Sequence, residues 1–283
     1  MMAVFRQSLA DAGYIEGRTV TIEPRWAEGD YSRLPALAAE LVRRQVAIII
    51  ATGGSAPAVA AKSATATIPI VFSVTDDPVT LELVASFARP GGNVTGVSFL
   101  LSALGAKQLG LLHELVPNAA LLGLLVNPNN ANAEPVASEV MSAAAAIGKR
   151  TEVVRAGDIR EIEAAFAALV RSRADALIVA SDPLFFSRRL QLATLATRHA
   201  IPAIYNVREY AEAGGLMSYG TSLTEVYQQV GAYVGRIVKG STPADLPVVQ
   251  SVKFELVINQ PTARALGIEI PPTLLARADE VIE

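Results

Sequence analysis

Residues 41–52 read LVRRQVAIIIAT, and residues 169–181 read LVRSRADALIVAS, the same pattern with one residue inserted. In both stretches an apolar run ends at a hydroxyl residue. A helical pattern then follows, and after it an Ile-Pro strand, IPIVF at 68–72 and IPAIY at 201–205. Short apolar strands that alternate with helices are typical of parallel sheets covered by helices on both faces. The repetition therefore predicts two similar α/β lobes.

The rest of the chain continues this alternation. Apolar residues recur with helical spacing in some segments and form short runs in others. We expect helices near 4–12, 34–43, 104–116, 134–147, 162–170, 184–198, 223–237 and 259–266, and strands near 19–26, 46–51, 69–74, 94–99, 121–126, 151–154, 175–180, 202–205 and 252–258. We predict two Rossmann-like lobes with parallel sheets, one from 1–98 plus 218–245 and the other from 99–217 plus 246–283.

The composition excludes several classes of protein. At 283 residues, 51% apolar and 18% charged, the chain is long enough for two cores and too apolar for disorder. A net charge of -3 without a basic run argues against nucleic acid or an anionic membrane as partner. No apolar run reaches the ~18 residues that a membrane span needs, so we expect no direct membrane insertion. We also find no signal peptide, because Met1 leads directly into an amphipathic segment.

Residue counts also limit the chemistry. There are no cysteines, so disulfides and thiolate catalysis are excluded, and the two histidines, His113 and His199, each lie in an expected helix. The sequence therefore offers too few suitable histidines to favour a histidine-based metal site or a Ser-His-Asp triad. We expect no metal, no cofactor and no catalytic residue.

Polar residues gather where the expected strands end. Ligands bind outside the carboxyl ends of strands in open parallel sheets, so these positions are the candidate contacts in a cleft between the lobes. Phe99 and Tyr219, near strand ends, could contact an apolar part of the ligand, with core packing as the alternative. The polar candidates are Thr52, Gly53, Gly54, Ser55, Asp76 and Asp77 in the first lobe, and Asn127, Asn129, Ser181, Asp182 and Asn206 in the second.

The turn at 52–55, TGGS, is the most informative of these. Glycines let the backbone approach a ligand, and the helix that follows carries free N–H groups with a partial positive charge. Such a turn suits a carboxylate or phosphate, although it lacks the lysine of a nucleotide-binding P-loop. The alternative is a capped turn without a ligand.

The acidic candidates Asp76, Asp77 and Asp182 allow three interpretations. They could accept hydrogen bonds from a ligand ammonium, cap helices, or serve as acid–base residues of an α/β enzyme. We predict a small carboxylate-bearing ligand, such as an amino acid. In this prediction Thr52 and Ser55 hold the carboxylate, Asp182 or Asp77 accepts from the amino group, and Asn127 adds a polar contact.

Several strings together resemble the substrate-binding proteins of ABC importers in the tryptophan/tyrosine transport class. They are RWAEGDY at 25–31, ATGG at 51–54, IPIVF at 68–72, RPGGNVTG at 89–96, LVNPN at 125–129, GLMSYG at 215–220 and ARADEVI at 276–282. The resemblance implies a type I periplasmic-binding fold with three hinge crossings. It also implies ligand capture without catalysis, a permease and an ATPase as partners, a periplasmic or other extracytoplasmic location, and carboxylate recognition by the 52–55 turn.

The chain departs from the family pattern at its start. Members begin with an export signal and a first strand, whereas this chain starts at the first expected helix. We therefore expect the first strand to be missing between the strands at 19–26 and 46–51, at a cost in stability. A sensor domain of a transcription regulator shares this fold and is a further alternative, but it needs a helix-turn-helix ahead of it.

Overall fold

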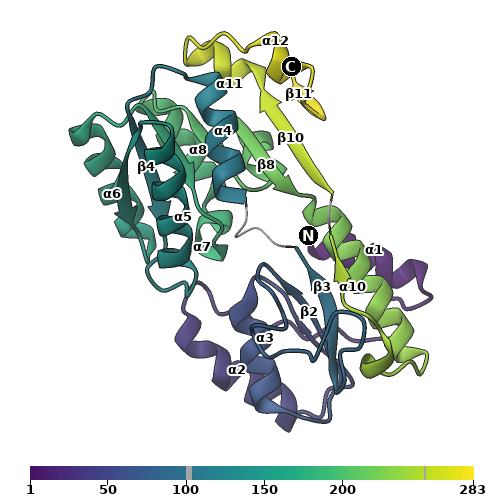
Figure 1. The fold of residues 1–283 in the computed structure, drawn as a ribbon. Helices are drawn as coiled ribbons and strands as arrows, with labels where there is room; N and C mark the ends of the chain where they lie inside the picture. Colours follow the sequence, from purple (N-terminus) through teal and green to yellow (C-terminus); the bar gives the residue numbers. More distant parts are fainter. Residues whose placement is uncertain (100–103, 252) are drawn as a thin grey trace. The chain divides into compact units, whose positions relative to one another are not determined.

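A computed structural model describes residues 1–99, 104–251 and 253–283 (Figure 1). The chain divides into two compact units, the first from residues 1–100 and 223–252, the second from 101–222 and 253–283. These bounds differ by a few residues from the expected lobes. Residues 218–222 continue β8 (Met217–Thr221) of the second unit, and 246–252 include β9 (Val249–Gln250), which pairs with the first unit's sheet.

The first unit holds a four-stranded parallel sheet in the order β1-β2-β3-β9. Its helix α1 packs on α10 at a point where a side chain on Gly231 would come within 2.6 Å of the Cβ of Ser8. The remaining strands of this unit are β1 (Ile49–Ala51), β2 (Ile70–Val74) and β3 (Val94–Ser98); its helices are α1 (Met2–Asp11), η1 (Tyr31–Arg33), α2 (Leu34–Arg43), α3 (Ser55–Ala64), α10 (Leu223–Val238) and η3 (Pro243–Asp245).

The strand expected at 19–26 is not formed, so this prediction is wrong. The only pairing nearby is a single bridge between Glu16 and Val20, and β1 itself is three residues long instead of six. Period-two alternation gives a strand only where a neighbouring strand supplies ladder hydrogen bonds. Among the described residues β1 pairs on one side alone, with β2. That a first strand is missing beside β1 stays a prediction.

The second unit holds a seven-stranded sheet in the order β11-β10-β8-β7-β6-β4-β5. All neighbours are parallel except β8 and β10. Besides β8, its strands are β4 (Leu121–Val126), β5 (Arg150–Arg155), β6 (Ala176–Val179), β7 (Ala203–Tyr205), β10 (Phe254–Asn259) and β11 (Glu280–Ile282); its helices are α4 (Gly105–Leu115), α5 (Ala133–Ala146), α6 (Ile159–Ser172), α7 (Pro183–Ser187), α8 (Arg189–Arg198), α9 (Arg208–Glu212), α11 (Gln260–Ala265) and α12 (Pro272–Leu275).

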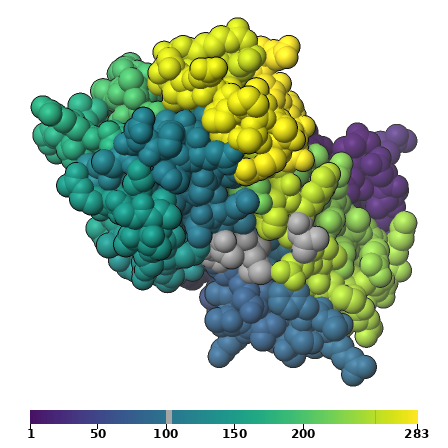
Figure 2. Space-filling view, turned by 45° about the horizontal axis from the view of Figure 1, so that its top comes forward, coloured from purple at the N-terminus to yellow at the C-terminus, as the bar shows by residue number. Residues whose placement is uncertain are grey.

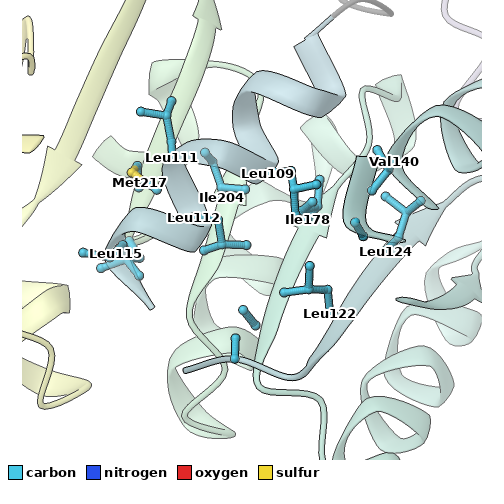
Figure 3. Close-up of a cluster of buried hydrophobic side chains, with 14 of the residues drawn as sticks. Leu109, Leu111, Leu112, Leu115, Leu122, Leu124, Val140, Ile178, Ile204 and Met217 are labelled. Atoms are coloured by element: carbon cyan, nitrogen blue, oxygen red, sulfur yellow. The ribbon is translucent and has the colours of Figure 1, made fainter. Parts of the chain in front are cut away.

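The core of the second unit lies between α4, α5 and one face of the sheet (Figure 3). Leu109 and Leu112 of α4 meet Leu122 of β4 and Ile178 of β6, all at most 2% exposed. The carboxyl-terminal residues, yellow in Figure 2, lie at the surface of this unit, and α12 packs on α4: Glu114 accepts hydrogen bonds from the Thr273 hydroxyl at 2.7 Å and from the Arg277 guanidinium at 2.8 Å. The C-terminal segment is therefore an integral part of this unit.

The two similar sequence stretches take equivalent places. β1 and β2 are parallel neighbours in the first sheet, and β6 and β7 are parallel neighbours in the second. The prediction of an α/β fold with parallel-strand sheets is confirmed. The helix expected at 184–198 is instead two helices, α7 and α8, which meet at Arg188. Within the described residues, no helix is both long and apolar enough to cross a membrane.

Candidate functional site

The turn after β1 presents backbone donors. Gly53 has φ +95°, and Gly54, the residue that precedes α3, has φ +107° and ψ -175°, a conformation that is open essentially only to glycine. No side chain caps α3, and Pro57 in its first turn has no N–H to satisfy. The positive end of the helix dipole and its first N–H groups are therefore available to an anion.

Asp76 lies beside this turn. The Ser55 hydroxyl donates a hydrogen bond to Oδ2 of Asp76, and the Thr75 hydroxyl donates to the same oxygen at 3.3 Å. The Ser98 hydroxyl, at the end of β3, donates to the Asp76 backbone oxygen at 3.3 Å. Residues that follow β1 and β2 thus meet at one edge of the sheet, as the carboxyl ends of parallel strands should. Because the hydroxyl hydrogen of Ser55 is directed at Asp76, the Ser55 oxygen can act toward any further group only as an acceptor.

The other first-unit candidates lie elsewhere. Oδ1 of Asp77 accepts the backbone N–H of Val79 at 2.8 Å, and the side chain is exposed, which is the geometry of a turn cap. Phe99 is only 5% exposed, and its N–H extends the ladder to the Val74 oxygen at 2.9 Å. Of these two residues, only Asp77 presents its side chain to solvent.

In the second unit, Asp182 forms the centre of a buried network. It is 4% exposed and caps α7, with its Oδ1 accepting the N–H of Leu184 at 2.8 Å. The Asn127 amide donates to Oδ1 at 3.0 Å, and the Asn130 amide donates to Oδ2 at 2.9 Å. The ends of β4 and β6 are joined through these contacts. Asp182 therefore has a structural role whatever else it contacts.

Two more candidates surround this network. The Asn130 amide also lies 3.4 Å from the backbone oxygen of Ser181, so Ser181 contributes its main chain. The Asn129 amide is directed away, to the oxygen of Gly157 at 3.5 Å. Sequence reasoning grouped Asn129 with Asn127, but the turn that joins them separates their side chains, because Oδ1 of Asn127 accepts the N–H of Asn129 at 2.9 Å.

Asn206 and Tyr219 occupy neighbouring strands. Asn206 follows β7, is 8% exposed, and its Oδ1 lacks a partner among the described residues. Gly220 of β8 lies against the Asn206 main chain, since a Cβ added at Gly220 would lie 1.7 Å from the backbone oxygen of Asn206. The ring of Tyr219 is partly exposed and lies 6.0 Å from that of Phe254.

Gln108 was missed by the sequence analysis. It is 5% exposed on α4, and its amide donates to the backbone oxygens of Tyr219 at 2.9 Å and Tyr205 at 3.4 Å. The sequence feature that could have identified Gln108 is its place as a polar residue beside Leu109, in a helical stripe that is otherwise apolar. In the described parts of the chain, no three histidine or acidic side chains gather as metal ligands.

Comparison with known proteins gives a consistent result. A family model described as "ABC transporter substrate binding protein" matches residues 2–282. A tyrosine-binding protein from Clostridioides difficile is 29% identical over 267 residues, which are 94% of this chain and 76% of that protein. A Streptococcus pneumonia ABC domain in complex with L-Trp has a TM-score of 0.86 and 28% identity, covering 99% of this chain and 93% of its own. A conserved domain protein from Vibrio cholerae has a TM-score of 0.87 and 30% identity, over 99% and 95% of the two chains. The chain therefore belongs to the ABC transporter substrate-binding protein family, with its type I periplasmic-binding-like fold.

Proposed function

We propose that this protein captures an aromatic L-amino acid for an ABC importer. The observation that supports the proposal is the hydrogen bond between the glycine turn and Asp76, because the uncapped start of α3 would suit an anion and the Asp76 carboxylate beside it would suit a cation. The named ligands of two relatives, tyrosine and L-Trp, support the aromatic character.

The two charged groups of an amino acid match this edge. The ligand carboxylate would accept hydrogen bonds from the first N–H groups of α3, near Gly54 and Ser55, with help from the Thr52 hydroxyl. The ligand ammonium would donate to Asp76 and to the Ser55 oxygen, which is an acceptor in this arrangement. Asp76 replaces Asp77 and Asp182 in this role, since Asp77 caps a turn and Asp182 already accepts from the amides of Asn127 and Asn130.

Candidates in the second unit are Asn206 and Tyr219. The unpartnered Oδ1 of Asn206 is an acceptor, and the partly exposed Tyr219 ring offers an aromatic face. Asn127, Asn129, Ser181 and the buried Phe99 would act indirectly, by fixing the loops and the core behind these groups. In this proposal the protein catalyses nothing, works outside the cytoplasm, and delivers its ligand to a permease driven by an ATPase.

Calorimetry with four related compounds tests the ligand class. L-Tryptophan carries both charged groups, tryptamine lacks the carboxylate, and indole-3-propionate lacks the ammonium; L-tyrosine tests the ring. Each lost charged hydrogen bond should cost ~1.5–3 kcal/mol, or about 10- to 150-fold in affinity. A thermal-shift screen with sugars and small carboxylates is the control, since a ligand at ~100 times its Kd stabilises by about 2.7 kcal/mol. Stabilisation by a sugar alone would overturn the proposal.

A further inference from the structure

Helix α9 carries a buried carboxyl group that ligand capture does not use. The helix packs against β7, β8, β10 and α8, and three of its five residues are buried. Glu209 is 9% exposed, and its Oε2 has no hydrogen-bond partner in the described part of the chain. A buried ionised carboxylate without a partner is costly, so the protonated form of Glu209 is favoured in this setting.

The neighbours of Glu209 reinforce this preference. Burial raises the pKa of Glu209 first of all, and the negative charges of Glu212 and Glu255 raise it further, whereas a hydrogen bond from its own backbone N–H and the charge of Arg208 lower it. β10 presents Glu255, whose Oε1 is also buried without a partner, and burial raises the pKa of that carboxyl too. The other titratable or charged groups near α9 are Tyr205 of β7, Tyr210 of α9 itself, Arg189 of α8 and Asp182 of the α7 cap.

The nearest cation is already engaged elsewhere. Arg208 pairs with Glu212 at 2.9 Å and with Glu255 at 3.2 Å, and also with Glu280. These contacts join α9 to β10 and β11. Glu209 is not among its ion pairs, so a negative charge on Glu209 would compete with three carboxylates for one guanidinium.

We propose that α9 is a pH-sensitive latch, docked on β10 while Glu209 carries a proton and loosened when Glu209 ionises. The direction follows from linkage. The folded second unit binds this proton more tightly than the unfolded chain, whose glutamates titrate near 4.3. The stability that the second unit gains from binding this proton is fully present below about pH 4.3. It is lost as the pH rises toward and through the raised pKa of Glu209 in the folded state. Because α9 begins two residues after Asn206, loosening it would also release the carboxyl end of β7.

Hydrogen exchange of the intact, ligand-free chain tests the latch. Protection factors of amides at 208–215 are compared at steps from pH 5 to pH 8.5, alongside urea unfolding. In the wild type, protection should fall by up to about tenfold for each pH unit between 4.3 and the folded-state pKa of Glu209. In Glu209→Gln the fall should shrink to the part that Glu255 contributes, and protection at pH 8.5 should exceed that of the wild type.

Two further variants exclude simpler explanations. Glu212→Gln removes the same charge from the exposed side of the same helix, with its side chain 50% exposed. Because that charge raises the pKa of Glu209, the fall in protection should move to lower pH but should not disappear. Glu209→Met replaces the carboxyl by an apolar group of similar length, and should flatten the profile as Gln does. The proposal is overturned if Glu209→Gln retains the wild-type profile, or if Glu212→Gln flattens it equally. Neither outcome depends on which ligand the protein binds.

Discussion

The carboxyl ends of the two sheets are built from similar residues but in opposite ways. In the first unit, the turn at 52–55 and Asp76 are partly exposed, and helix α3 has no side-chain cap. In the second unit, Asp182 is 4% exposed and accepts from Asn127, from Asn130 and from the start of α7. The same topological position thus holds an accessible polar edge in one unit and a closed polar network in the other.

This difference separates binding from stability. Hydrogen bonds that are already satisfied in a buried network are expensive to exchange, because each unmade bond leaves a desolvated group. A partly exposed serine–carboxylate pair exchanges partners with solvent or ligand at a much lower cost. We therefore expect substitutions in the second network to change folding, and substitutions at the first edge to change affinity.

The largest effect is expected for Asp182→Ala. It leaves the buried Asn127 amide and the Asn130 amide without their acceptor and removes the α7 cap, so the free energy of unfolding of the second unit should fall by about 3 kcal/mol. Urea unfolding followed by hydrogen exchange in β4 and β6 measures it. Asp182→Asn keeps one acceptor oxygen and should lose less; equal losses for both variants would contradict this account of the network.

Gly54→Ala should have the next largest effect, lowering the free energy of unfolding of the first unit by about 2 kcal/mol. A side chain at φ +107° and ψ -175° is strained by roughly 1–3 kcal/mol, and relief of the strain would turn the first N–H groups of α3 away. Affinity should fall with stability in this variant. Gly110→Ala, at an exposed position of α4, is the matched control: no heavy atom lies within 4 Å of the added Cβ, and the gain in helix propensity should stabilise by up to ~1 kcal/mol. A Gly54→Ala protein as stable as the wild type would show that the turn has other accessible conformations.

Asp76→Asn should weaken ligand binding with little change in folding. Loss of the charge facing the ligand ammonium should cost ~1.5–3 kcal/mol of affinity for a zwitterionic aromatic amino acid, at least about tenfold. Stability should change by less than about 1 kcal/mol because the pair is partly exposed. Calorimetry on Asp76→Asn and Asp77→Asn, side by side, makes the comparison. If the two variants lose the same affinity, Asp76 has no special place in the site.

The smallest effect is expected for Asp77→Ala. Its carboxylate caps one exposed N–H, that of Val79, so about 0.5–1 kcal/mol of stability should be lost. Affinity should stay at the wild-type value. A drop in affinity without a drop in stability would show that Asp77 contacts the ligand, and would contradict the assignment of the ammonium contact to Asp76.

Much of this organisation could be predicted from local sequence. The apolar runs at 46–51 and 175–180 indicated parallel strands, and the glycines at 53 and 54 indicated a turn whose backbone no other residue adopts easily. β8 was not predicted, although it lies inside the second sheet between β7 and β10. Its sequence, MSYGT, lacks the run of aliphatic residues that marked the other strands, and its strand conformation comes from the ladders on both sides.

The sequence by itself determined the alternation of helices and strands, the repeated unit and the residue types at the strand ends, because these depend on neighbours a few positions apart. Only the tertiary structure decided how those residues are used. Residues 19–26 lie outside the sheet because no strand among the described residues pairs with them. The Ser55 hydroxyl is hydrogen-bonded to Asp76, and the Asp182 carboxylate is hydrogen-bonded to two asparagine amides. The tertiary structure also buried Glu209, a residue of α9 itself. Each of these outcomes depends on groups 20 or more positions apart or on burial by other elements, which no local pattern encodes.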